Sequence, residues 1–299
     1  MEAQWTPQRI SPLRGWGPMV VLPVAVIVLT PTAWPRWAFM WLLAIILFVG
    51  CKWLTWRRTP IPNAQWWQHA GYLFAWPGMD ARAFLNPERL PKQDRPAPTA
   101  WVFAALKLFA GAILFWGVAR RVPDNQRIIF GWVGMVGLIL ILHFGTFDLL
   151  SCAWRSIGID ARPLMDWPLT SVSVSEFWGR RWNRAFRDLT HRLVFRPLSG
   201  RLGPRRGILV GFVFSGLLHD LVISLPAGGG YGWPTVFFGI QVAAVFVERS
   251  GGGRAFGLGR GWRGWLFTTV ILVLPAYGLF HPPFVNNIIV PFMQALGAR

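Results

Sequence analysis

Apolar stretches long enough to cross a lipid bilayer constrain this chain more than any other feature of its sequence. Residues 101–119, 128–150 and 207–225 are almost entirely apolar, and a helix needs roughly 20 such residues to cross a hydrocarbon core about 30 Å thick. Only 14% of the residues are charged, against about 25% in a soluble globular domain. The sequence therefore predicts an all-α integral membrane protein with one multi-pass domain over residues 1–299.

We expect about eight transmembrane helices, of which the first, second, sixth and last are short for full crossings. The first is favoured over a signal peptide because no small-residue cleavage site follows it. No internal repeat is detected. The expected segments are residues 18–31, 37–51, 100–119, 128–150, 207–225, 234–247, 265–280 and 285–297.

The polar stretch 151–206 contains a further helical pattern. At 100° per residue, apolar side chains from Trp178 to Leu193 share one face, and the opposite face carries Arg180, Arg184, Arg187 and His191. This pattern predicts an interfacial amphipathic helix along the inner membrane surface.

The net charge of +18 indicates membrane orientation rather than a nucleic acid partner, because the basic residues lie in loops between apolar spans. Most of the 30 Lys and Arg residues fall in one alternate set of loops, above all 52–99 and 151–206. Cytoplasmic loops carry such an excess, so both termini are predicted to be cytoplasmic. The excess of Arg over Lys is associated with GC-rich bacterial genomes and favours a bacterial cytoplasmic (inner) membrane.

Two further patterns carry no chemistry. Cys51 and Cys152 lack the spacing of a metal site or a disulfide framework, so no metal is expected. The glycines of 228–232 resemble a phosphate loop, but they follow a membrane helix and predict a turn.

The dipeptide His219-Asp220 lies deep within an apolar span that is otherwise uncharged. At 1.5 Å per residue, His219 is roughly 18 Å from the start of that span. Ionisable groups at this depth are costly and indicate a function, and a neutral imidazole can accept a proton as a general base. Gly211 and Ser215 share its face and would allow a close approach. The alternative is a histidine that only bonds a neighbouring helix.

A second membrane histidine competes with it. His143 lies in the fourth span, with Asp148 about one turn later, and position alone does not rank the two histidines. His281, beside two prolines at an outer boundary, is interpreted as structural.

Two motifs resemble those of a known family. Residues 173–183 read Ser-Val-Ser-Glu-Phe-Trp-Gly-Arg-Arg-Trp-Asn, and residues 215–220 read Ser-Gly-Leu-Leu-His-Asp. Both are similar to blocks of the membrane-bound O-acyltransferases, in particular their wax synthase-like branch. The resemblance covers a core over residues 76–284. Four shorter segments also resemble the family: 76–80, 143–145, 231–241 and 281–284.

The resemblance implies a helical core of that family, with a buried site that acyl-CoA enters from the cytoplasm and a lipophilic alcohol enters from the membrane lipids. His219 would match the catalytic histidine and Asn183 its companion. The reaction it implies needs no acyl-enzyme, metal or cofactor. The chain departs from the family in having Asp220 where many members have Glu, and in its shorter length. The residues expected to bind substrate are Trp178, Arg180, Arg181, Trp182, Arg184, Ser215, His143 and Asp220, with Arg187 beside them.

Two other functions remain open. A transporter or flippase could use His143, Asp148, His219 and Asp220 as an intramembrane proton relay, although the paired repeats typical of transporters are not detected. A non-catalytic assembly subunit would place Asn183 and His219 far apart.

Overall fold

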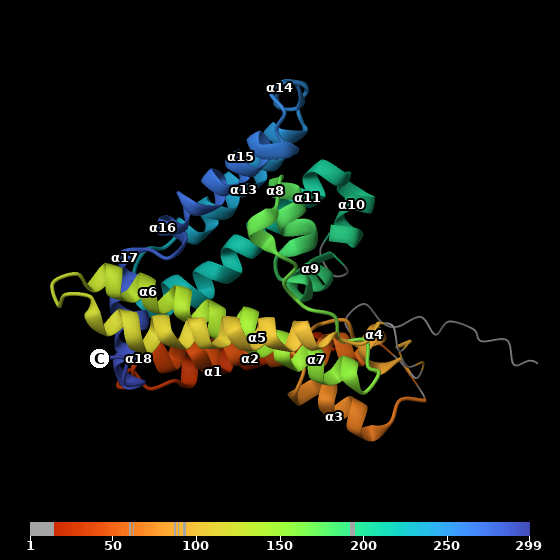
Figure 1. Cartoon of the computed structure of the whole chain (residues 1–299), viewed down its shortest axis with the longest axis horizontal. Coiled ribbons are helices and arrows are strands. Elements are labelled where there is room, and N and C mark those ends of the chain that lie inside the picture. The colour runs from red at the N-terminus through yellow and green to blue at the C-terminus, as the bar shows by residue number, and fades with distance from the viewer. Residues whose placement is uncertain are drawn as a thin grey trace, which may run out of the picture.

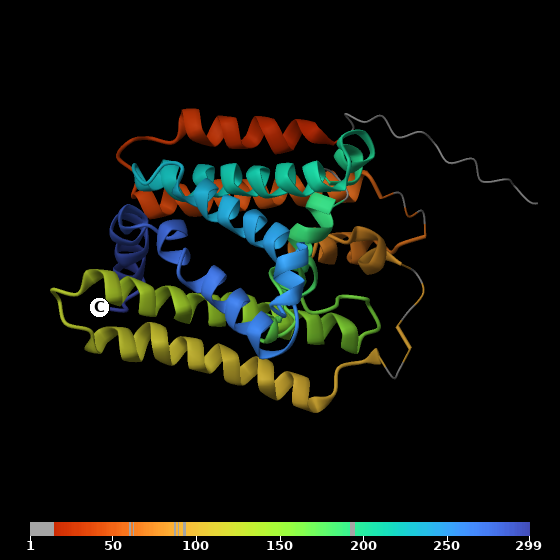
Figure 2. The same cartoon turned by 90° about the horizontal axis from the view of Figure 1, so that it is seen from above.

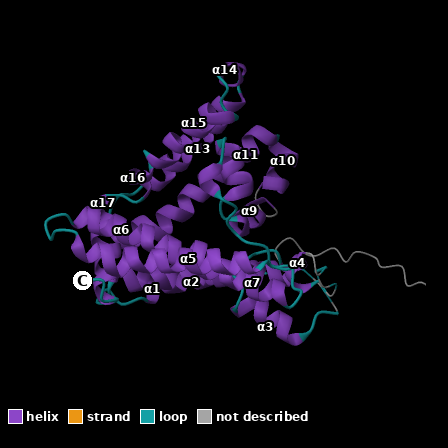
Figure 3. Cartoon of the chain, in the orientation of Figure 1, coloured by secondary structure: helices purple, strands orange, loops and turns teal. Residues whose placement is uncertain are grey.

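The computed structural model is helical throughout the part that it describes, which is residues 15–59, 61, 63–86, 88, 90–91, 94–191 and 195–299. No strand occurs in these residues (Figure 3), so the prediction of an all-α protein is confirmed. Four described helices are long and apolar enough to cross a membrane, and one bent pair would make a fifth span. The four cover Arg36–Arg57, Pro98–Arg121, Arg127–Ser156 and Pro204–Ala227.

Eight full crossings are therefore not found. The first predicted span is α1, whose 14 residues (Trp16–Leu29) are too few to cross alone. The sixth is α13, with 17 residues (Trp233–Arg249). The last two form the bent pair Gly261–Leu279 and Pro282–Ala295, which meet at 61°.

A layer of roughly parallel helices forms one part of the molecule (Figures 1 and 2). Glycines allow its members to pack closely: a Cβ on Gly111 would lie 2.6 Å from the carbonyl oxygen of Gly137, and one on Gly145 would lie 2.6 Å from the Leu108 Cβ. Small residues are the usual means of such close approach in membranes. The layer comprises α1, α2 (Arg36–Arg57), α5 (Pro98–Ala112), η2 (Ile113–Val118), η3 (Ala119–Arg121), α6 (Arg127–Ile139), η4 (Leu140–Thr146) and α7 (Phe147–Ser156).

A second group of helices rises obliquely from this layer in Figure 1. Its largest contact pairs α11 with α13, and Gly216 of α11 abuts the backbone of Thr235 in α13. The main core lies where α13 meets the layer, with Phe130, Phe238 and Ile288 almost fully buried. The second group comprises α10 (Arg196–Leu202), α11 (Pro204–His219), η8 (Asp220–Ser224), α12 (Leu225–Ala227), α13, α14 (Gly251–Ala255), α15 (Gly261–Val273), α16 (Ala276–Leu279), α17 (Pro282–Phe284), η9 (Val285–Ile289) and α18 (Val290–Ala295).

The predicted interfacial amphipathic helix is not continuous. It is divided into α8 (Val174–Glu176), the π-helical η6 (Phe177–Arg181) and α9 (Arg184–Thr190). The chain breaks at Asn183, which adopts a left-handed φ of 43° that asparagine tolerates better than most residues. Ala185 and Leu189 pack into a second core with α3 (Trp66–Phe74) and α4 (Ala81–Leu85). The apolar face of α9 thus covers protein, and the part of the prediction on residues 192–194 lies outside the described residues.

The described chain begins and ends at opposite ends of the helical layer; residues 1–14 lie outside the described part, and the cytoplasmic placement of both termini stays a prediction. Gly15 lies against Leu54 and Arg57, at the end of α2. Arg299 pairs with Asp124 at 3.0 Å, in the turn between α5 and α6. Figure 1 shows the C-terminus at the left and α3 and α4 at the right. The last predicted span lies within the second helix of the bent pair and packs on α6.

Candidate functional site

The imidazole of His219 is held in one tautomer by the backbone of its own helix. Its Nδ1 lies 2.7 Å from the carbonyl oxygen of Ser215. A carbonyl only accepts hydrogen bonds, so in the neutral ring Nδ1 carries the proton and Nε2 presents a lone pair. Nε2 has no hydrogen-bond partner in the described part of the chain. Ser215 thus positions His219 through its backbone, and His219 ends α11 just before the π-helical η8, a kind of segment often found at functional sites.

A continuous set of aromatic contacts, here called the aromatic wall, connects the two membrane histidines. Neighbouring ring centroids along it are 4.7 to 6.2 Å apart, within the range of favourable aromatic pairs. One ring is also fixed by its polar edge, because Trp178 Nε1 donates to Gln241 Oε1 at 3.3 Å. The predicted substrate residues Trp178 and Trp182 belong to this wall. In order, it consists of His219, Phe238, Trp178, Phe177, Trp182 and His143.

Asn183 follows directly on the aromatic wall and begins α9. Its Oδ1 accepts from the backbone N–H of Phe186 at 3.1 Å, an N-cap bond that secures the first turn. Its own N–H points to Met165 Sδ at 3.1 Å. With Oδ1 committed to the backbone, the side-chain NH2 is the group that Asn183 can offer to a ligand.

The segment before Asn183 is tied to α13 by a buried carboxylate that the sequence did not single out. Glu248 accepts from the backbone N–H groups of Val174 at 2.8 Å and Ser175 at 2.9 Å. A carboxylate at a helix N-terminus is favourable because it meets unpaired N–H groups. This bond fixes α8, and with it the aromatic wall, against α13.

Arg181 is engaged inside the protein and does not line the cavities described below, and its role in substrate binding stays a prediction. Its Nε donates to Glu176 Oε1 at 2.7 Å, and its Nη1 donates to the carbonyl oxygen of Asp166. Burial raises the pKa of Glu176, but hydrogen bonds from the Val172 N–H and from Arg181 outweigh it, so this pKa is lower than usual. The pair holds the turn that precedes Asn183.

Asp220 has a structural role as a helix cap, and its role in substrate binding stays a prediction. Oδ1 accepts from the Gly232 N–H at 2.8 Å and Oδ2 from the Thr235 N–H at 3.1 Å, so the carboxylate caps α13. Ser224 Oγ donates to Oδ1 at 3.0 Å and lies 3.2 Å from His281 Nε2. This network joins η8, α13 and the start of α17, in agreement with a structural His281.

His143 lies in the π-helical η4 and stacks on Trp182 at a centroid distance of 6.2 Å. Its Nδ1 is buried without a partner in the described residues. One turn later, Asp148 forms an ion pair with Lys107 of α5, so the span contains a paired charge rather than an isolated one. Sequence reasoning noted Asp148 but not this partner.

Two adjoining cavities lie at the end of the layer that carries α3, α4 and α9. The larger has a volume of about 370 Å³. Arg180, Arg184 and Arg187 line it together with residues between Trp76 and Ala83. Arg162 also lines it and was missed, because it precedes the predicted amphipathic helix. Neither His219 nor Asn183 is among the lining residues of either cavity.

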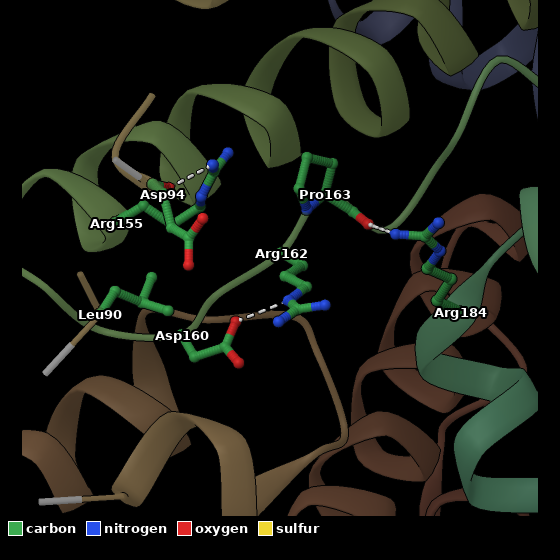
Figure 4. A pocket seen from close by; sticks show the side chains of 7 residues that line it. All are labelled: Leu90, Asp94, Arg155, Asp160, Arg162, Pro163 and Arg184. Carbon is green, nitrogen blue, oxygen red and sulfur yellow. Dashed lines mark hydrogen bonds and ion pairs between the residues drawn. The ribbon is translucent and has the colours of Figure 1, made fainter. Parts of the chain in front are cut away.

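The smaller cavity, of about 290 Å³, is shown in Figure 4. It shares Asp160, Arg162 and Arg184 with the larger one. Arg162 pairs with Asp160 at 3.1 Å, and Arg155 donates to the Asp94 carbonyl oxygen at 2.6 Å. The two cavities therefore form a basic region next to Asn183.

Comparison with known proteins agrees with these motifs. Residues 161–240 match the model of the membrane bound O-acyl transferase family, a range that includes Asn183 and His219. A long-chain-alcohol O-fatty-acyltransferase of Simmondsia chinensis is 24% identical over 197 residues, which cover 58% of this chain and 55% of that protein. A probable long-chain-alcohol O-fatty-acyltransferase 9 of Arabidopsis thaliana is 29% identical over 216 residues, 68% of this chain and 62% of that protein.

The chain thus matches less than two thirds of the length of these relatives. The family match over residues 161–240 contains both motif blocks and every residue of the aromatic wall except His143. Residues 161–240 are thus similar to the membrane bound O-acyl transferase family, and the chain is similar to plant long-chain-alcohol O-fatty-acyltransferases.

Proposed function

We propose that this protein transfers an acyl group from acyl-CoA to the hydroxyl of a lipophilic alcohol. The observation that carries the proposal is the bond between His219 Nδ1 and the Ser215 carbonyl oxygen, because it leaves Nε2 as a base within a membrane helix. The names of the relatives in Simmondsia chinensis and Arabidopsis thaliana support a long-chain alcohol as acceptor.

In the proposed reaction, Nε2 of His219 removes the proton of the alcohol while the alcohol oxygen attacks the thioester carbonyl. Collapse of the tetrahedral intermediate breaks the carbon–sulfur bond, and the imidazolium returns its proton to the thiolate, so that free CoA leaves. The Asn183 NH2 steadies the donor or the developing oxyanion by donating hydrogen bonds. In this scheme His219 carries one proton from the alcohol to the thiolate.

The basic cavities suit the phosphate groups of the donor. One guanidinium group can bind two phosphate oxygens at once. Arg180, Arg184 and Arg187, from the elements that flank Asn183, line the larger cavity. Arg184 and Arg187 are also paired with Asp166 and Asp188, which orients them. A donor held there would direct its acyl end along the aromatic wall toward His219.

The same cavities suggest the orientation of the protein. The end of the layer with α3, α4 and α9 would face the cytoplasm, where acyl-CoA is soluble and where basic residues concentrate. The C-terminus would then lie on the outer side. A bacterial cytoplasmic membrane is part of this proposal, and a cysteine-labelling assay on intact cells at either end would test it.

The alternative function, a transporter or flippase with an intramembrane proton relay, is less well supported by the structure. Both oxygens of Asp220 are bound to backbone N–H groups of α13, and Asp148 is paired with Lys107. A proton relay needs acidic groups that can exchange protons along a path, so two of its four members are committed elsewhere.

Labelled acyl transfer by the purified protein in detergent tests the proposed function. We expect turnover with long-chain acyl-CoA and long-chain alcohols, and its loss in His219→Ala. Absence of turnover in the wild type with fatty, isoprenoid and sterol alcohols would contradict the proposal. Turnover retained in His219→Ala would remove that residue from the mechanism.

A further inference from the structure

Lys52 is a buried lysine that neither the motifs nor the family resemblance singles out. It lies in α2, five residues before the helix ends, and its relative exposure is 1%. Lysine is almost never buried to this degree without a partner that offsets the cost of desolvation. Its contacts therefore indicate what the burial achieves.

The amine contacts a segment that follows α3 in the chain. Nζ donates to the carbonyl oxygen of Gly78 at 2.7 Å and lies 3.2 Å from the ring centroid of Tyr72. The Tyr72 hydroxyl lies 2.6 Å from Thr55 Oγ1, one turn further along α2. A cation over an aromatic face and a charge-assisted hydrogen bond are both strengthened away from water.

The segment that Lys52 holds has little freedom of its own. A Cβ on Gly78 would lie 2.3 Å from Trp76 Nε1, so the backbone passes directly over the indole. Asp80 then caps α4 by accepting from the N–H groups of Arg82 and Ala83. This segment, residues 76–83, is fixed at Gly78 by a membrane helix and at Asp80 by a cap.

Residues 76–83 also line the larger cavity. Trp76, Gly78, Met79, Asp80 and Ala83 share its lining with Arg180, Arg184 and Arg187, which come from a distant part of the chain. Any displacement of the Gly78 backbone would change the width of this 370 Å³ cavity. Lys52 thus connects a membrane helix to the cavity proposed for the donor phosphates.

We propose that Lys52 is a positioning residue for the acyl donor: by holding the Gly78 carbonyl, it sets the distance between residues 76–83 and the arginines across the cavity. The proposal rests on the proposed function for the identity of the ligand as acyl-CoA. It does not place Lys52 in contact with the reacting atoms. The expected signature is weaker binding of the donor with an unchanged chemical step.

The test compares Lys52→Met, which keeps the length and apolar stem of the side chain, with Thr55→Val. Lys52→Met should raise the KM for acyl-CoA about tenfold with kcat within about twofold of wild type, as for the loss of uniform binding. Thr55→Val alters the same helix but leaves the Lys52–Gly78 bond, and should keep the wild-type KM. An unchanged KM for acyl-CoA in Lys52→Met would overturn the proposal. So would a loss of kcat accompanied by a lower melting temperature, because that pattern indicates a general structural role.

Two measurements separate this inference from the proposed function. Amide hydrogen exchange over residues 76–85 should be faster in Lys52→Met than in wild type and Thr55→Val, whatever the enzyme catalyses. Binding of free CoA, followed by tryptophan fluorescence, should weaken about tenfold. If the wild type shows no turnover, the exchange and binding results still decide the role of Lys52, and unchanged exchange would contradict it.

Discussion

The two membrane histidines lie in similar settings and differ in how the protein treats their nitrogens. His219 and His143 both lie in helices long enough to span the bilayer, and both contact aromatic rings. His143 lies within a π-helical segment, and His219 directly precedes one. His219 has its Nδ1 bound to the Ser215 carbonyl oxygen, whereas His143 has a buried Nδ1 without a partner in the described chain.

This difference shows that depth in the membrane does not identify a base. A backbone carbonyl can fix one tautomer of a neutral imidazole without a charged partner. Of these two histidines, only His219 is bonded to such a carbonyl within the described chain. The surroundings differ as well, because the network around Asp220 secures α13 beside His219, while His143 depends on stacking with Trp182. Five experiments test whether the two histidines and the residues around them have these different roles.

The largest expected effect is on catalysis by His219→Ala. We expect turnover to fall by about 10³-fold, within the range for loss of a general base, while the protein folds as before. Initial rates with labelled acyl-CoA measure the loss. His219→Gln serves as a polar control and should be similarly impaired, and activity above a tenth of wild type in either variant would end the distinction between the histidines.

The next largest effect is on stability, in Asp220→Ala. Removing this carboxylate leaves the N–H groups of Gly232 and Thr235 without their acceptor. We expect the free energy of unfolding to drop by about 2–4 kcal/mol, seen as a lower melting temperature in detergent. Asp220→Asn keeps one acceptor oxygen and should lose less. Full stability with a selective loss of alcohol binding would instead restore Asp220 as a substrate residue.

His143→Ala should have a smaller effect than either. We expect a loss of activity of at most about tenfold, because the ring contributes stacking to Trp182, and aromatic pairs contribute about 1 kcal/mol. Steady-state kinetics beside His219→Ala measure the ratio of the two effects. Equal losses in the two variants would mean that both histidines act on the reaction.

Arg180 and Arg181 provide a matched pair of neighbouring cations. Arg180 lines the larger cavity and is exposed, whereas Arg181 is bound to Glu176. Arg180→Gln should raise the KM for acyl-CoA by about threefold, and the effect should shrink at high salt, since exposed charges are screened. Arg181→Gln should reduce melting temperature more than KM. The reverse pattern would contradict the placement of the donor.

The smallest effect concerns pH. The pKa of Glu176 is lower in the folded protein than its usual value of 4.5, so the folded state favours the charged form. This stabilisation is present above the unfolded pKa and is lost as the pH falls below about 5 and through the folded pKa. Glu176→Gln should therefore be less stable than wild type near neutral pH and approach it in acid. Melting temperatures across that range measure the difference.

Sequence reasoning found the elements of the site better than the roles of the residues around it. The depth of His219 and the cluster of arginines after Trp178 follow from hydropathy and spacing. The break at Asn183 does not, because a left-handed residue within an amphipathic pattern interrupts no periodicity. The capping roles of Asp220 and Glu248 depend on partners 12 to 74 residues away.

Hydrophobic length and the cost of a buried ionisable group are local properties, so the sequence alone indicates a helical membrane protein with a histidine deep in a span. Which arginines line a cavity and why Lys52 is buried follow only from the tertiary structure. Those outcomes depend on which backbone groups and rings from distant segments meet each side chain, because hydrogen bonds act only over a short distance. The bond of His219 to Ser215 is local, within one helix, but the sequence alone does not show the rotamer that makes it.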